Sequence, residues 1–173
     1  MRGFSLIEIL ISSVILIIIF TGVFFVLNAG DQSWNAGTGS LDLQQQVRQA
    51  MDGMSKELRQ TRGGNITIEP DSRSINFTVP ISITTDPVTY SSVINYYLNA
   101  TSNQLERLHP SDAESKVLAN DIADLSFCCQ GGSDCFDCQN STLLQIQVNG
   151  TKTVRQRALT PFNLTEEVGL RNE

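Results

Sequence analysis

Glu8 is the only charged residue in a long apolar stretch near the start of the chain. The stretch runs from Phe4 to Leu27 and consists mostly of Ile, Leu, Val and Phe. A helix rises ~1.5 Å per residue, so this length reaches the ~30 Å thickness of a bilayer's hydrocarbon core. A carboxylate well inside that core costs ~2.5–3.5 kcal/mol on insertion scales. Glu8 therefore either stays hydrated near the interface or pairs with a cation.

The nearest cation that the chain can supply is a new N-terminus. Cleavage after Gly3 gives Phe4 a free ammonium group about one helical turn from Glu8. The two charges can then pair within one chain, or between neighbouring chains whose helices are staggered along a common axis. Gly3, Phe4 and Glu8 are thus the residues whose spacing points to processing and pairing.

Four cysteines cluster between residues 128 and 138 and form the second group with reactive chemistry. Two disulfides among these cysteines would close the short loop between them. Four cysteines allow three pairings. A bridge between adjacent Cys128 and Cys129 would strain the backbone, which leaves two pairings of these residues with Cys135 and Cys138. A four-thiolate zinc site is the rival interpretation, but adjacent cysteines are a poor first half for it. We expect two disulfides and no metal.

The N-terminal pattern resembles a known signal. Gly3, Phe4, Glu8 as the fifth residue after the cut, and the apolar run to Leu27 resemble the class III signal of type IV pilins and type II secretion pseudopilins. In that family a prepilin peptidase cuts after the glycine and methylates the new N-terminal phenylalanine. The resemblance implies cleavage between Gly3 and Phe4, N-methylation of Phe4, and a role for Glu8 in assembly. The leader, residues 1–3, carries one positive charge, fewer than is usual in the family.

Two other interpretations of the apolar run are an ordinary signal anchor and a cleaved secretory peptide. The secretory peptide is disfavoured because the run is too long and Ala29-Gly30 is a poor match to a small-x-small cleavage site. Arg2 precedes the run and Asp31 is the first charge after it, which predicts a cytoplasmic N-terminus and a translocated remainder. The translocated side of a bacterial inner membrane is oxidising, which favours disulfides.

The rest of the composition excludes several classes of protein. The formal net charge is −6 and the basic residues are scattered, so a phosphate-tracking surface for nucleic acid is not expected. His109 is the only histidine, and no recognisable catalytic pattern surrounds it. We expect no enzymatic activity and no cofactor. Some pseudopilins bind calcium, but the acidic residues available here do not have EF-hand spacing: Asp112, Glu114, Asp121 and Asp124.

Two helical segments are expected before the strands, and residues 29–40 lie between them. Residues 29–40 contain three glycines and Asn35, which are poor helix formers, and Trp34, which suits a membrane interface. We expect a helix break or a linker there. Residues 41–62 regain helical period, with an apolar stripe whose members are spaced by three or four: Leu43, Val47, Met51, Met54 and Leu58. The stripe needs a partner, either the chain's own sheet or a neighbouring subunit.

The sequence predicts antiparallel strands over residues 63–173. Ile66 to Val79 alternates around a turn and predicts a hairpin, and further strands are expected at residues 93–98, 105–108, 122–127 and 144–148. Asn149-Gly150 is a tight-turn signal, after which residues 154–159 are expected to return as a strand. The stretch from Phe162 to Leu170 is apolar enough to pack on the head.

The predicted fold class is α+β. A leader (1–3) precedes a transmembrane or assembly helix (4–28), a break or linker (29–40), an amphipathic helix (41–62) and an antiparallel head (63–173) with the cysteine loop 128–138. This plan is similar to that of pilins, and three segments loosely resemble the J-type minor pseudopilins and related minor pilins: 43–62, 93–98 followed by 104–107, and 168–172.

This resemblance implies a structural subunit of a type II secretion pseudopilus or a type IV pilus, in a tip or initiation complex. Its implied partners are other pilin subunits through the N-terminal helix, the prepilin peptidase and the inner-membrane assembly platform. The implied location is the bacterial inner membrane, with the head in the periplasm, and then the filament. The alternative is a signal-anchored periplasmic binding or sensor domain that forms no filament.

Overall fold

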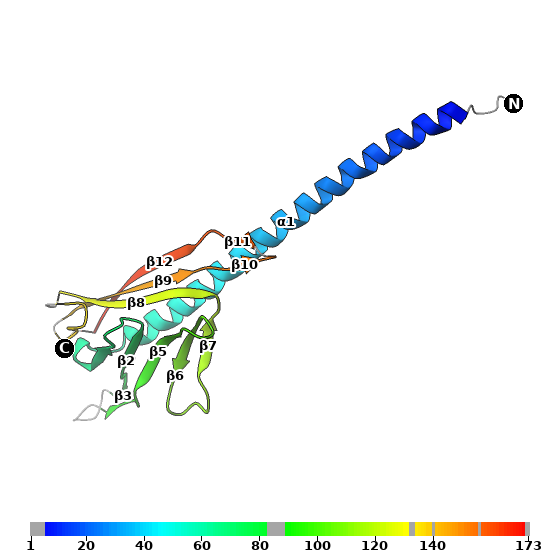
Figure 1. Cartoon of the computed structure of the whole chain (residues 1–173). Coiled ribbons are helices and arrows are strands. Elements are labelled where there is room, and N and C mark those ends of the chain that lie inside the picture. The colour runs from blue at the N-terminus through cyan, green and yellow to red at the C-terminus, as the bar shows by residue number, and fades with distance from the viewer. Residues whose placement is uncertain (1–5, 83–88, 132–133, 140, 156, 172–173) are drawn as a thin grey trace. The chain divides into compact units, whose positions relative to one another are not determined.

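The computed structural model describes the chain except residues 1–5, 83–88, 132–133, 140, 156 and 172–173 (Figure 1). The fold is α+β, with one long apolar N-terminal helix followed by antiparallel strands. Contacts divide the chain into two compact units, Met1–Gly39 and Ser40–Glu173. We call the second unit the head.

Helix α1, Leu6–Leu58, supplies the whole described part of the first unit. Every residue from Leu6 to Trp34 is exposed, including the large apolar side chains. By length and composition α1 is apolar enough to cross a membrane, and none of its most apolar window is buried within the chain. An apolar surface of this kind is stable only against lipid or against another apolar surface.

The break or linker predicted at residues 29–40 is absent, because α1 continues through them without interruption. Polar side chains in this region bond to the helix itself. Asn35 donates to the carbonyl oxygen of Asp31 at 2.7 Å, and Thr38 donates to that of Trp34 at 3.0 Å. Each glycine in a helix costs ~1 kcal/mol relative to Ala, but extending an existing helix requires no new nucleus. Residues 29–40 therefore remain helical because the chain is helical on both sides of them.

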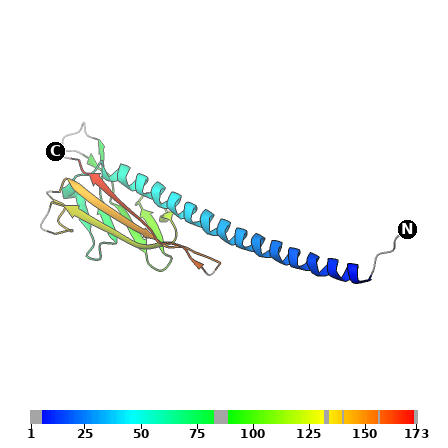
Figure 2. The same cartoon turned by 90° about the horizontal axis from the view of Figure 1, so that it is seen from above.

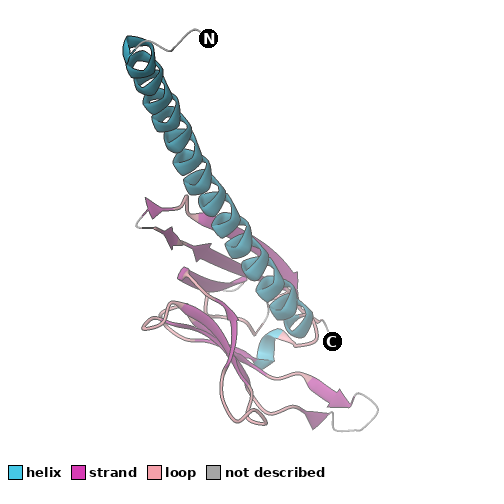
Figure 3. Cartoon of the chain, turned by 90° about the vertical axis from the view of Figure 1, so that its right-hand side faces the viewer, coloured by secondary structure: helices cyan, strands magenta, loops and turns pink. Residues whose placement is uncertain are grey.

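The predicted apolar stripe of the second helical section is confirmed. Leu43, Val47, Met51, Met54 and Leu58 are each no more than 2% exposed. They join one core cluster with residues from the strands of the head. Figure 3 shows the helix lying across the strands within the head. The helix ends four residues earlier than predicted, and Gln60 and Thr61 close it by donating to carbonyls three residues back, at 3.1 Å each. A short 3-10 helix, Gly63–Asn65, follows.

The larger sheet among the described residues has the strand order β1-β2-β5-β6-β7 and is antiparallel throughout. The hairpin predicted between Ile66 and Val79 is confirmed as β1 paired with β2. The strand bounds are β1 Ile66–Ile68, β2 Ser74–Phe77, β5 Ile94–Asn99, β6 Gln104–Leu108 and β7 Lys116–Ala119. The stacked rings of Phe77 and Tyr96 lie 5.7 Å apart in the core. Beside this sheet, β3 (Pro80–Ser82) pairs only with β4 (Thr89–Tyr90) in the described chain.

A second antiparallel sheet has the order β12-β9-β8, and its long strands run side by side in Figure 2. Its strands are β8 Ile122–Gln130, β9 Leu143–Gly150 and β12 Phe162–Gly169. The predicted strands near 122 and 144 and the packing of the last stretch are thus confirmed.

The tight turn predicted at Asn149-Gly150 is wrong, because both residues belong to the end of β9 and pair with β12. A Cβ on Gly150 would lie 3.0 Å from the Leu43 side chain, so strand and helix approach each other closely at this glycine. The expected return over residues 154–159 is also wrong. β10 (Thr153–Val154) pairs with β11 (Arg157–Ala158), and β12 is the strand that returns along β9.

The cysteine loop is closed by two disulfides, one between Cys128 and Cys135 and one between Cys129 and Cys138. This is one of the two pairings that the sequence left open. The loop packs against the short 3-10 helix that follows α1, since a Cβ on Gly63 would collide with the carbonyl oxygen of Cys138. The N–H of Arg171 donates to the carbonyl oxygen of Thr61 at 2.9 Å and brings the chain's last described residues to the same place.

The two disulfides differ in burial, which predicts different contributions to stability. Cys129 and Cys138 are 3% and 2% exposed, whereas Cys135 is exposed. Replacing both Cys129 and Cys138 by Ala should lower the free energy of unfolding by about 2–5 kcal/mol, the usual range for a lost disulfide. The matched variant Cys128→Ala/Cys135→Ala should lose less, because it leaves no buried cavity. Urea unfolding followed by circular dichroism measures both, and equal losses would contradict the assignment.

Candidate functional site

Glu8 lies in the first turn of α1 with its side chain exposed. A shallow groove on the helix surface is lined by Glu8, Ile9, Ser12, Ser13 and Leu16. The Ser12 hydroxyl donates to the carbonyl oxygen of Glu8 at 2.7 Å, and the Ser13 hydroxyl donates to that of Leu10 at 2.8 Å. Because both hydroxyls bond to their own helix, the two serines offer a small, nearly apolar surface beside the carboxylate.

The same internal bonding holds for the next polar residues along α1. Thr21 donates to the carbonyl oxygen of Ile17 at 2.8 Å and Asn28 to that of Phe24 at 3.1 Å. Glu8 is consequently the one charged group between Leu6 and Gly30, on a surface otherwise fit for lipid or for other apolar helices. The arrangement can do two things: bury an apolar helix against a partner, and pair one carboxylate with one cation. Gly3 and Phe4 lie outside the described residues.

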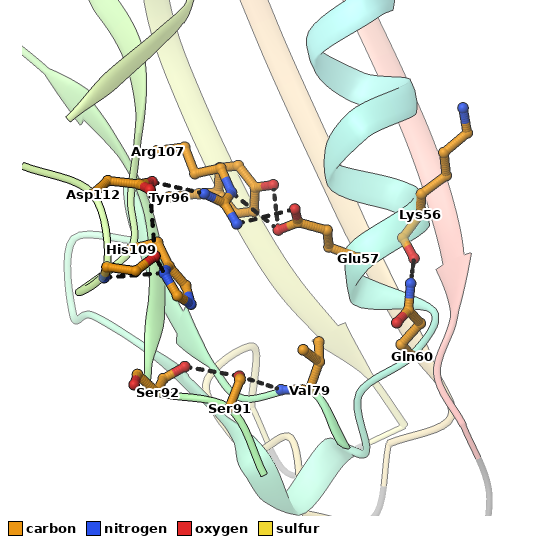
Figure 4. A network of polar contacts seen from close by, with 11 residues as sticks. Lys56, Glu57, Gln60, Val79, Ser91, Ser92, Tyr96, Arg107, His109 and Asp112 are labelled. Atoms are coloured by element: carbon orange, nitrogen blue, oxygen red, sulfur yellow. Dashed lines mark hydrogen bonds and ion pairs between the residues drawn. The ribbon is translucent and has the colours of Figure 1, made fainter. Parts of the chain in front are cut away.

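Within the head, a polar network fixes α1 to the larger sheet (Figure 4). Glu57 of α1 accepts hydrogen bonds at Oε2 from the Tyr96 hydroxyl, at 2.8 Å, and from Arg107 Nε, at 3.2 Å. Its Oε1 lies 3.2 Å from Nη2 of Arg107. The guanidinium also bonds to Asp112, from Nη1 to Oδ2 at 3.2 Å. Burial, and then the negative charge of Glu57, raise the pKa of Tyr96, so its hydroxyl remains a donor at neutral pH.

A second polar cluster lies on the opposite face of that sheet. Glu106 is only 5% exposed and accepts hydrogen bonds from Tyr97 at 2.6 Å, Asn99 at 2.8 Å and Ser115 at 2.5 Å. Hydrogen bonds from Ser115 and Tyr97 to the carboxylate lower the pKa of Glu106. The carboxylate is therefore ionised and accepts a hydrogen bond at each of its two oxygens. The cluster ties the loop before β7 to the sheet.

The acidic residues considered for calcium are not brought together. Asp112 pairs with Arg107, Asp121 with Lys152 at 3.5 Å, and Asp124 with Arg73 at 3.1 Å. Among the residues that the structure describes, no group of three or more His, Cys, Asp or Glu side chains is placed to hold a metal ion. His109 is half-buried, and its Nδ1 lies 2.5 Å from the Ser111 hydroxyl in a local turn.

Sequence reasoning found Glu8 and the cysteines but missed the two polar clusters of the head. Glu57 is next to Leu58 of the apolar stripe, and Tyr96 and Arg107 lie on different strands, so no local spacing connects the three residues. The one signal in the sequence is alternation: Tyr96 and Arg107 occupy positions of β5 and β6 that face the helix.

Comparison with protein-family models gives no match for this chain, and no curated protein matches it significantly in sequence.

The Glu57 network predicts a measurable coupling between helix and sheet. Glu57→Ala removes the acceptor of the buried Tyr96 hydroxyl and one partner of Arg107, and should lower the free energy of unfolding by about 1–3 kcal/mol. Asp52→Ala is the matched control, because Asp52 is an exposed carboxylate on the same helix, and should change stability by no more than about 0.5 kcal/mol. Urea unfolding of the full chain in detergent micelles measures both variants. Equal effects would show that the network contributes nothing beyond surface charge.

Proposed function

We propose that this protein is a minor pilin-like structural subunit of a type II secretion pseudopilus or a type IV pilus. The observation that carries the proposal is the exposed apolar surface of α1 with Glu8 as its single charge, preceded in sequence by Gly3-Phe4. Such a helix needs either lipid or other copies of an apolar helix around it. A filament core formed by many such helices satisfies this need outside the membrane.

In this proposal the precursor waits in the bacterial inner membrane with its N-terminus in the cytoplasm and its head in the periplasm. The prepilin peptidase releases Phe4, and the helix then leaves the bilayer for the filament with the help of the assembly platform. The apolar surface is buried before and after this transfer. The change in apolar burial is therefore small, and an external motor can drive assembly or disassembly.

Glu8 supplies the register between subunits. A carboxylate surrounded by apolar helices and left unpaired is costly, whereas pairing with an ammonium group and its hydrogen bonds offsets that cost. The amine of Phe4 in an adjacent, staggered subunit is the cation that the processed chain supplies. The end of that neighbouring helix would contact the shallow groove that Ile9, Ser12, Ser13 and Leu16 form beside Glu8.

The head gives each subunit a folded, disulfide-stapled domain for the periplasm. The two disulfides fit an oxidising compartment. The position in a tip or initiation complex rests on the resemblance of head segments to the J-type minor pseudopilins. We propose no reaction, cofactor or bound metal for the head.

The role of Glu8 is tested by separating processing from assembly. Glu8→Ala should be cleaved and methylated like the wild type but enter filaments about tenfold less, the effect of losing an interaction worth ~1.4 kcal/mol. Glu8→Gln, which keeps the shape and removes the charge, should be equally impaired. Ser12→Ala is the control in the same groove and should assemble normally. Shed filaments quantified by immunoblot give the incorporation, and wild-type incorporation of both Glu8 variants would refute the pairing.

A further inference from the structure

Trp34 is the only tryptophan of the chain and lies on the surface of α1 with 73% of its area exposed. It follows the apolar run, in a turn that also carries Asp31 and Asn35. An indole ring has an apolar body and one polar N–H, and it is most stable at the boundary between hydrocarbon and headgroups. Trp34 thus has the chemistry of an interfacial residue and lies where α1 changes from apolar to polar.

The continuity of α1 fixes the separation between Trp34 and Glu8. The two residues are 26 positions apart on one unbroken helix. At ~1.5 Å per residue the separation is about 39 Å, or about 37 Å along the bilayer normal at the usual ~20° tilt. The hydrocarbon core is ~30 Å thick, and the bilayer with its headgroup regions is ~40–45 Å thick. The separation lies between these two thicknesses.

The separation of Trp34 and Glu8 matches the distance between the two headgroup regions of a bilayer. When Trp34 lies in the headgroup region of one leaflet, Glu8 lies in that of the other. Helical side chains lean toward the helix N-terminus, so the indole leans back toward Leu27 while the Glu8 carboxylate leans away from the hydrocarbon. A shift that moved Trp34 into water would draw Glu8 into the core, at ~2.5–3.5 kcal/mol on insertion scales.

We infer that Trp34 occupies the outer lipid–water interface of the membrane-bound precursor, in the one register that keeps Glu8 hydrated at the opposite interface. The partner of this surface is the lipid headgroup layer. Glu8 then needs no counter-charge in the membrane, and its need for an ammonium partner begins when the helix leaves the bilayer. This inference rests on the membrane-spanning step of the proposed function and on no property of the filament.

The inference is tested by the depth of single tryptophans. The full, uncleaved chain is reconstituted in vesicles of phosphatidylethanolamine and phosphatidylglycerol that contain lipids brominated at shallow or at deep acyl positions. Shallow bromine should quench Trp34 emission more than deep bromine does, and the emission should lie at a shorter wavelength than in urea. Quenching by aqueous iodide without quenching by either lipid would place Trp34 in water and overturn the inference.

Two variants in a Trp34→Phe background serve as matched references. Ile18→Trp, near the middle of the stretch from Glu8 to Leu27, should be quenched more by deep bromine. Ile7→Trp reports the depth of its neighbour Glu8 and should be quenched more by shallow bromine. Deep quenching of Ile7→Trp would place Glu8 in the hydrocarbon and overturn the shared register.

These outcomes are independent of the filament proposal. The experiment uses no peptidase and no assembly machinery, so a permanent anchor and a pilin precursor give the same quenching pattern. An uncleaved N-terminus in cells would refute the pilin proposal and leave the depth measurement intact. A misplaced Trp34 would refute the register and leave processing intact.

Discussion

The structure depends on one constraint, which is that the exposed apolar surface of α1 cannot remain in water. Every residue from Leu6 to Trp34 is exposed, and the polar side chains of Ser12, Thr21 and Asn28 bond to their own helix and leave that surface apolar. In the proposed function, lipid satisfies this surface in the membrane, and other apolar helices satisfy it in the filament. Glu8 is the one charge on the surface between Leu6 and Gly30, so its hydration or pairing distinguishes the two states.

The same helix also builds the head. Its later turns bury Leu43, Val47 and Met54 in the core, and Glu57 bonds to Tyr96 and Arg107 on neighbouring strands. The disulfide-closed loop packs against Gly63, just after the helix ends. In the proposed filament a load on the helix is thus transmitted to the strands of the head by packing and hydrogen bonds.

The sequence predicts features that depend on local spacing, and misses those that depend on contacts between distant residues. The apolar run, the stripe from Leu43 to Leu58 and the hairpin from Ile66 follow from periodicity, and all three are present. Two predictions from local propensity are wrong. The expected break at residues 29–40 is continuous helix, and the expected turn at Asn149-Gly150 is the end of strand β9. In the first case helix propagation outweighs the local propensity. In the second, antiparallel pairing of Asn149 and Gly150 with β12 outweighs it. Glu8 was identifiable because its environment is set by its neighbours in sequence, whereas the Glu57 and Glu106 clusters form only in the folded sheet.

The measurement that tests the central claim most directly is the N-terminal mass of the protein recovered from bacterial membranes with and without a prepilin peptidase. The proposed function predicts a chain that begins at N-methylated Phe4 when the peptidase is present and an uncut chain when it is absent. A chain that stays uncut in both conditions would contradict it, since α1 would then be a permanent anchor and the head a periplasmic binding or sensor domain.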